Sequence, residues 1–171
     1  MSVSLRYRGL IAAAAVALVM FPSASHAAGG FSLLGSGSNY LDLGVGTLNI
    51  EGATSAGGRV EVRLGEKLWK IGPALGCLAD GDGELFGYGG VYVDIAYRRL
   101  VLTPLLAAGI YNKGDGKDLG GPFEFREALT LAWQFHNGLR IGIQVAHISN
   151  AHIYPQNPGQ QDVLLTVAAP F

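Results

Sequence analysis

The sequence predicts an all-β fold, an eight-stranded antiparallel transmembrane β-barrel of the outer-membrane type. Eight segments alternate large apolar residues with glycine or polar residues, which is the period of a strand with two different faces. The chain is 49% hydrophobic, contains 26 glycines and has a mean hydropathy of +0.29, without helical periodicity. It also begins with an export signal. A barrel whose outside faces lipid combines these features, because its apolar residues alternate with residues that face the lumen.

The first 27 residues resemble a secretory signal peptide that is cleaved from the mature protein. A basic region with two arginines comes first, an apolar run follows at 10–20, and small residues occupy 25–27. The apolar run is shorter than the roughly 18 residues that a membrane-spanning helix needs. We therefore expect a signal peptide at 1–27 and one outer-membrane β-barrel domain at 28–171.

The composition excludes several classes of function. The formal net charge is −1, so nothing indicates nucleic acid as a partner. Cys77 is the single cysteine, which excludes an intramolecular disulfide and argues against a cysteine-based metal site. We expect no cofactor.

The first four strands are expected at 40–50, 59–64, 70–79 and 85–97. In the second of them the apolar residues Val60, Val62 and Leu64 alternate with the charged residues Arg59, Glu61 and Arg63. Charges at every other position suit a polar lumen in which they can pair. We expect a paired lumen network that plugs the barrel, because eight strands leave room only for side chains. Its expected members are Arg59, Glu61, Arg63, Asp94, Glu124 and Arg126.

The last four strands are expected at 100–111, 123–135, 139–150 and 161–171. Pro104 weakens the first of these, since proline cannot donate to a strand ladder. The chain ends on Phe171 at the apolar parity of its last strand, and a terminal aromatic residue resembles the outer-membrane assembly signal. Aromatic residues such as Trp69, Tyr97 and Trp133 are expected to form an interface girdle or to face lipid.

The connections between these strands alternate in length. Those at 51–58, 112–122 and 151–160 are long, and those at 65–67, 98–99 and 136–138 are short. This alternation is typical of a barrel with external loops and tight periplasmic turns. The acidic connection at 80–84 lacks the spacing of a calcium loop. A polar external turn is the favoured interpretation, with a weak divalent-cation site as the alternative.

The seventh strand ends with a departure from its own pattern. Leu139, Ile141, Ile143 and Val145 share its apolar face, and continuing the alternation puts His147 and Ser149 on the same face. A base and a hydroxyl side by side on an apolar surface are costly to keep there without a use. If the strand starts at the short turn, the pair lies roughly 20 Å along the membrane normal, facing outward at the external rim. A nucleophile in that position meets only lipid.

Ester hydrolysis is the reaction that such a pair suits. His147 would remove the proton of Ser149, whose oxygen would attack an acyl carbonyl. A third group should orient the imidazole from its other nitrogen. By parity Gln161 points outward on the neighbouring eighth strand while Asp162 points inward, so the third position holds an amide.

These residues resemble the PagL-type lipid A 3-O-deacylases and the related acyloxyacyl hydrolase-like outer-membrane proteins. The shared pattern is a His-x-Ser-Asn-Ala segment at 147–151, a loop with Asn157 and Gly159, and then position 161. The resemblance is specific over 120–171. It implies that Ser149 is the nucleophile, His147 the general base and Asn150 part of the oxyanion hole. It also implies that the substrate is the acyl ester at position 3 of lipid A in lipopolysaccharide.

The chain departs from the family where Gln161 replaces a glutamate. An amide can hold the imidazole tautomer but cannot offset the imidazolium charge that forms during catalysis. We therefore expect reduced or differently tuned esterase activity, with a catalytically silent barrel of structural, adhesive or lipopolysaccharide-binding role as the alternative. The expected location is the outer membrane of a Gram-negative bacterium. The expected partners are lipopolysaccharide and outer-membrane lipid, with a homodimer left open.

Overall fold

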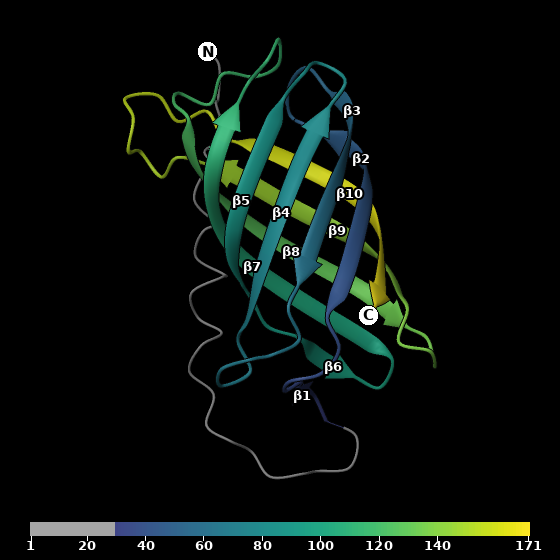
Figure 1. Cartoon of the computed structure of the whole chain (residues 1–171). Helices are drawn as coiled ribbons and strands as arrows, with labels where there is room; N and C mark the ends of the chain where they lie inside the picture. Colours follow the sequence, from purple (N-terminus) through teal and green to yellow (C-terminus); the bar gives the residue numbers. More distant parts are fainter. Residues whose placement is uncertain (1–29) are drawn as a thin grey trace, which may run out of the picture. The chain divides into compact units, whose positions relative to one another are not determined.

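The computed structural model describes residues 30–171, and residues 31–171 form a closed β-barrel (Figure 1). The signal peptide predicted at 1–27 lies outside the described residues. No helix in the described part has the length and apolar character to cross a membrane. The strands are β1 (Ser32–Leu33), β2 (Tyr40–Leu48), β3 (Ser55–Arg63), β4 (Gly72–Asp80), β5 (Leu85–Tyr92), β6 (Ile95–Tyr97), β7 (Leu100–Asn112), β8 (Phe123–Gln134), β9 (Arg140–Ser149) and β10 (Gln160–Pro170).

The wall consists of antiparallel neighbours and closes on itself. The order is β7-β5-β4-β3-β2-β10-β9-β8, and β7 also pairs with β8, which completes the ring. β5 and β6 both pair with β7 and together occupy one position in the wall. The two-residue β1 pairs with β6 outside the ring. The predicted eight-stranded antiparallel barrel is therefore confirmed.

The strand predicted at 85–97 is interrupted in the structure. β5 ends at Tyr92 and β6 begins at Ile95, and the gap lies opposite Pro104 of β7. Pro104 has no N–H to donate, so only its carbonyl bonds there, accepting from the N–H of Val93 at 3.2 Å. The ladder on the other side of β7, toward β8, continues through Pro104. The proline is tolerated because it interrupts one of two ladders.

The outer surface of the barrel is apolar. Outward residues such as Val45, Leu75 and Leu165 are each 64% exposed, while the residues between them are mostly buried or glycine. Side chains of this size would not stay exposed to water over a whole wall, and an outward apolar band is what lipid covers. Trp69, Trp133 and Tyr97 are also exposed, in agreement with the expected aromatic girdle.

The lumen holds charged side chains that pair with one another. Arg59 contacts Asp42 and Glu61 at 2.8 Å, and Arg63 contacts the same two carboxylates at 2.7 Å. Arg126 contacts Asp162 at 2.9 Å. The predicted network is confirmed for these residues. Glu124 differs, because neither of its buried carboxylate oxygens has a hydrogen-bond partner among the described residues.

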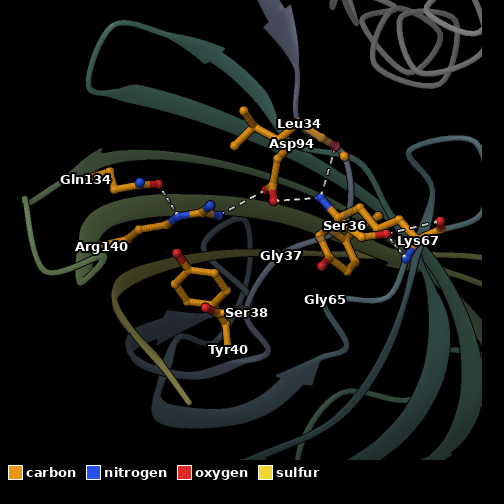
Figure 2. Close-up of a pocket in the computed structure, with 12 residues that line it drawn as sticks. Leu34, Ser36, Gly37, Ser38, Tyr40, Gly65, Lys67, Asp94, Gln134 and Arg140 are labelled. Carbon is orange, nitrogen blue, oxygen red and sulfur yellow. Dashed lines mark hydrogen bonds and ion pairs between the residues drawn. The ribbon is translucent and has the colours of Figure 1, made fainter.

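Asp94 belongs to a separate cluster at the end of the barrel that carries β1 and β6 (Figure 1). It contacts Lys67 at 3.0 Å and Arg140 at 3.1 Å, and Figure 2 shows its carboxylate between these two cations. The cluster lines a cavity of about 250 Å³ beside residues 34–38.

The connection from β3 to β4 is longer than the short turn that the sequence predicts. It spans residues 64–71 and packs against the segment that follows β1. The N–H of Gly37 donates to the carbonyl of Gly65, and the N–H of Lys67 donates to Ser36 Oγ. A side chain at Gly65 would meet the Gly37 carbonyl, so the close approach of the two segments requires glycine. The opposite end, with the loop at 150–159, positions the candidate site.

Candidate active site

The outward face of β9 changes character near its end. Ile141, Ile143 and Val145 are 47%, 53% and 49% exposed, and His147 and Ser149 continue the same face with intermediate exposure. Ala146 and Ile148, between them, are buried. The side chains of His147 and Ser149 therefore share the outer wall of the barrel, as the alternation predicts.

His147 lies in a row of three outward side chains that crosses three strands. Its partner in the register of β10 is Gln161, and its partner in the register of β8 is Glu127. The Gln161 Nε2 atom is 3.2 Å from His147 Nδ1. This interaction places the amide on the nitrogen from which a third catalytic group would orient the ring. Ser149 lies opposite Phe125 on β8.

The other side of the imidazole lies against bare backbone. A Cβ added at Gly159 would be 2.7 Å from His147 Cε1 and 3.4 Å from Nε2. Gly159 also has a φ of +65°, which favours glycine. The ring of His147 is therefore held between the Gln161 amide and a segment that has no room for a side chain.

Asn150 points away from this surface and is fully buried. Its Nδ2 donates to the carbonyl of Leu119 at 2.6 Å and to that of Gln156 at 2.8 Å, and its Oδ1 accepts from the His152 N–H at 3.0 Å. Both amide hydrogens are thus committed to loop carbonyls. The bond to Leu119 joins the β7–β8 loop (113–122) to the β9–β10 loop (150–159), and Figure 1 shows the two loops at the same end of the barrel.

Asn157 fixes the β9–β10 loop to the end of β9. Its Oδ1 accepts a hydrogen bond from the Asn150 N–H at 3.1 Å, and its Nδ2 lies 3.3 Å from Nδ1 of the exposed His152. Tyr154 supports the same loop, because its Oη accepts from the Phe123 N–H at 3.2 Å. The residues after Ser149 therefore have a defined position.

Several polar groups lie in the lumen behind the site. Gln160 Nε2 donates to Glu84 at 2.8 Å and to Asp162 at 3.2 Å. Glu84 lies in the β4–β5 connection, where burial raises its pKa to about 7. Hydrogen bonds from Gln160 and Tyr111 lower that pKa, and Asp162 and Asp80 raise it.

The acidic connection at 80–84 forms a turn closed by its own hydrogen bonds. Asp80 Oδ1 accepts from the N–H groups of Asp82 and Glu84 at 3.0 and 2.8 Å. Within residues 30–171 no group of three or more His, Cys, Asp or Glu side chains is arranged to hold a metal ion. The two hydrogen bonds of Asp80 support the polar-turn interpretation.

Alternation within the strands predicts that Ser149, His147 and Gln161 share one surface, but it does not predict that Glu127 lies beside them. The signal for Glu127 is the pairing register of β8 with β9, which alternation within one strand does not reveal. The sequence pattern also does not predict the contacts of Asn150, since its partners are carbonyl groups in loops.

Comparison with known proteins identifies the family. The model for lipid A 3-O-deacylase (PagL) matches residues 52–169, well over half of the chain. The chain belongs to the PagL family. The matched range contains every residue of the row across β8, β9 and β10.

Solved structures agree with the barrel fold. The crystal structure of the outer membrane enzyme PagL superposes with a TM-score of 0.64 at 17% identity, covering 77% of this chain and 99% of that one. A de novo designed transmembrane β-barrel has a TM-score of 0.55 at 13% identity, covering 82% of this chain and 100% of that one. No curated protein matches the chain. The protein is therefore an outer-membrane β-barrel of the lipid A 3-O-deacylase family.

Proposed function

We propose that this protein is a serine esterase that removes the 3-O-linked acyl chain from lipid A. The observation that carries the proposal is the shared outward face of His147, Ser149 and Gln161 at the loop-bearing rim of a lipid-covered wall. Groups on that face reach an acyl ester in the outer leaflet and do not reach a solute in the lumen. Membership of the family supplies the substrate class.

In the proposed reaction Ser149 Oγ attacks the ester carbonyl while His147 Nε2 takes its proton. The tetrahedral intermediate collapses, the sugar 3-oxygen leaves with the proton held by His147, and an acyl-enzyme forms. Water then attacks the acyl-enzyme with His147 again acting as base, which releases a 3-hydroxy fatty acid and restores Ser149. In the described residues the His147 side chain is hydrogen-bonded to Gln161 and not to Ser149. In this scheme Ser149 approaches Nε2 by side-chain rotation, because catalytic hydrogen bonds often form only with substrate bound.

Gln161 positions the imidazole in this scheme. For Nε2 to accept a proton from Ser149, Nδ1 must carry the ring hydrogen, and an acceptor must face it. A half-turn of the Gln161 amide brings Oε1 to that position. Gln161 Oε1 is buried and has no hydrogen-bond partner among the described residues. The half-turn would give this oxygen a partner, the Nδ1–H group of His147.

Asn150 contributes to the proposed oxyanion region by organising the loops, because both hydrogens of its amide are already bonded to carbonyl groups. Asn157 has an amide hydrogen to spare, since among residues 30–171 its Nδ2 contacts only one ring nitrogen, that of His152. It lies on the loop bonded to the residue after Ser149. Asn157 is therefore the side chain we propose as a donor to the developing oxyanion.

The test is release of 3-hydroxy fatty acid from lipopolysaccharide by the purified, refolded barrel. We expect Ser149→Ala to abolish release, lowering kcat by about a thousandfold or more. Ser38→Ala, an exposed serine at the opposite end of the barrel, is the matched control and should behave as the unmodified protein.

A catalytically silent barrel is the competing outcome, and Gln161 in place of a carboxylate is the feature that favours it. Mass spectra of lipid A from cells with and without the protein separate the two. An unchanged acyl pattern, or release that persists in Ser149→Ala, would contradict the esterase proposal.

A further inference from the structure

Glu127 is an acidic residue on the lipid-covered wall of the barrel. Arg126 and Ala128 on either side of it are buried, and Leu129, two residues along, is 42% exposed. Glu127 therefore points outward, with intermediate exposure. A carboxylate on the lipid-facing side of a barrel costs stability, and such residues are usually there for function.

The neighbours of Glu127 leave one residue that can explain it. Its register partner on β7 is Leu106, which is 45% exposed, and its register partner on β9 is His147. Within residues 30–171 no lysine, arginine or histidine nitrogen lies within ion-pair distance of its carboxylate. Glu127 thus has an apolar residue on one side and the imidazole of His147 on the other.

The remaining charged groups near His147 face the lumen. On β8 these are Glu124 and Arg126, and on β10 the charged group is Asp162, which pairs with Arg126. Gln161, in contact with the ring, carries no charge. No outward charge other than that of Glu127 therefore flanks His147 in the register of β8 and β10.

We propose that Glu127 supplies the negative charge that stabilises the His147 imidazolium during the reaction, in place of a carboxylate at position 161. This inference rests on the proposed esterase function. Directly paired residues of antiparallel strands have Cβ atoms about 4.5–5.5 Å apart. An opposite charge acts on an ionising group over about 4–6 Å, so Glu127 needs no hydrogen bond to the ring. A glutamate at position 161 would both orient the imidazole and offset its charge. In this chain we assign the orientation to Gln161 and the charge to Glu127.

Glu127→Gln tests the proposal, because it removes the charge and keeps the shape. We expect kcat for fatty acid release to fall by about 10- to 100-fold, in line with the effect of a charge at this distance, with KM nearly unchanged. Glu127→Asp should keep part of the activity. Glu66→Gln, an exposed carboxylate in the β3–β4 connection, is the matched control and should leave kcat unchanged.

A second substitution separates charge from structure. Gln161→Glu should restore most of the kcat lost in Glu127→Gln, and should give a smaller gain in the unmodified protein. Unchanged kcat in Glu127→Gln, a loss confined to KM, or no rescue by Gln161→Glu would overturn the role of Glu127. If Ser149→Ala is inactive while Glu127→Gln is fully active, the esterase proposal stands and this inference fails. If the unmodified protein releases no fatty acid, both fail.

Discussion

Gly159 shows how much of the candidate site depends on a single missing side chain. The His147 ring contacts the Gly159 backbone at a distance that a Cβ atom would forbid. The same position has a left-handed backbone conformation. The glycine therefore allows the loop to turn and the imidazole to occupy its place beside Gln161.

Gly159→Ala should displace the His147 ring and lower the rate of fatty acid release by about a hundredfold, while the barrel still folds. The magnitude is that expected when a misplacement of about 1 Å disturbs reacting groups. The measurement is release from lipopolysaccharide, with the heat-dependent mobility shift on a gel as the folding check. Gly87→Ala is the matched control, because a Cβ there meets nothing within 4 Å. Full activity of Gly159→Ala would show that the ring position does not limit the reaction.

At the scale of elements, the loops after β7 and β9 act as one unit. Asn150 joins them through one hydrogen bond to the Leu119 carbonyl and makes two more side-chain bonds within its own loop, and Asn157 and Tyr154 add one bond each. Loops tied in this way keep the chain after Ser149 in one position. The strands provide the wall, and this pair of loops provides the rim.

Asn150→Ala should loosen both loops and leave the strands intact. It removes three hydrogen bonds of about 1 kcal/mol each and leaves two loop carbonyls without a donor. We expect faster hydrogen exchange across residues 150–159 and slower fatty acid release, with unchanged exchange in β3 and β4. Exchange equal to that of the unmodified protein would contradict the structural role of Asn150.

The predictability of each element follows from the range of its interactions. Alternation within a strand identified all eight wall positions, because one side of every strand faces lipid and the other the packed lumen. It also identified the shared face of His147 and Ser149. Local pattern could not predict the register that brings Glu127 beside His147, since register depends on partner strands. The length of the β3–β4 connection depends on contacts with Ser36, which is 31 residues from Lys67. The break at Val93 depends on its pairing with Pro104 of the neighbouring strand.

For the whole molecule, the lumen is a packed interior in which paired charges lie among buried apolar side chains. Arginines and carboxylates pair within it, and the segment after β1 packs against the β3–β4 connection at one end. Near the other end, Glu84 is buried close to Asp162 and Asp80, and burial raises its pKa to about 7. A raised pKa means that the folded barrel binds this proton more tightly than the unfolded chain does.

The sign of the pH dependence follows from this difference. Below the ordinary pKa of glutamate, about 4.3, Glu84 is neutral in both states and costs nothing. As the pH rises from there to about 7, the unfolded chain loses the proton first and the folded barrel loses stability. Glu84→Gln removes this cost and keeps an acceptor for Gln160. We expect the variant to unfold several degrees higher than the unmodified protein at pH 8 and at the same temperature at pH 4. An equal difference at both values would contradict the assignment.

Because His147 and Ser149 lie on the outer wall, a lipid substrate would arrive sideways, by two-dimensional diffusion within its own leaflet. The quantity that sets saturation is then the surface mole fraction of that lipid. Turnover should therefore depend on the mole fraction of the substrate lipid in the membrane. Adding an inert amphiphile should lower the rate, whereas diluting the whole suspension should change it less.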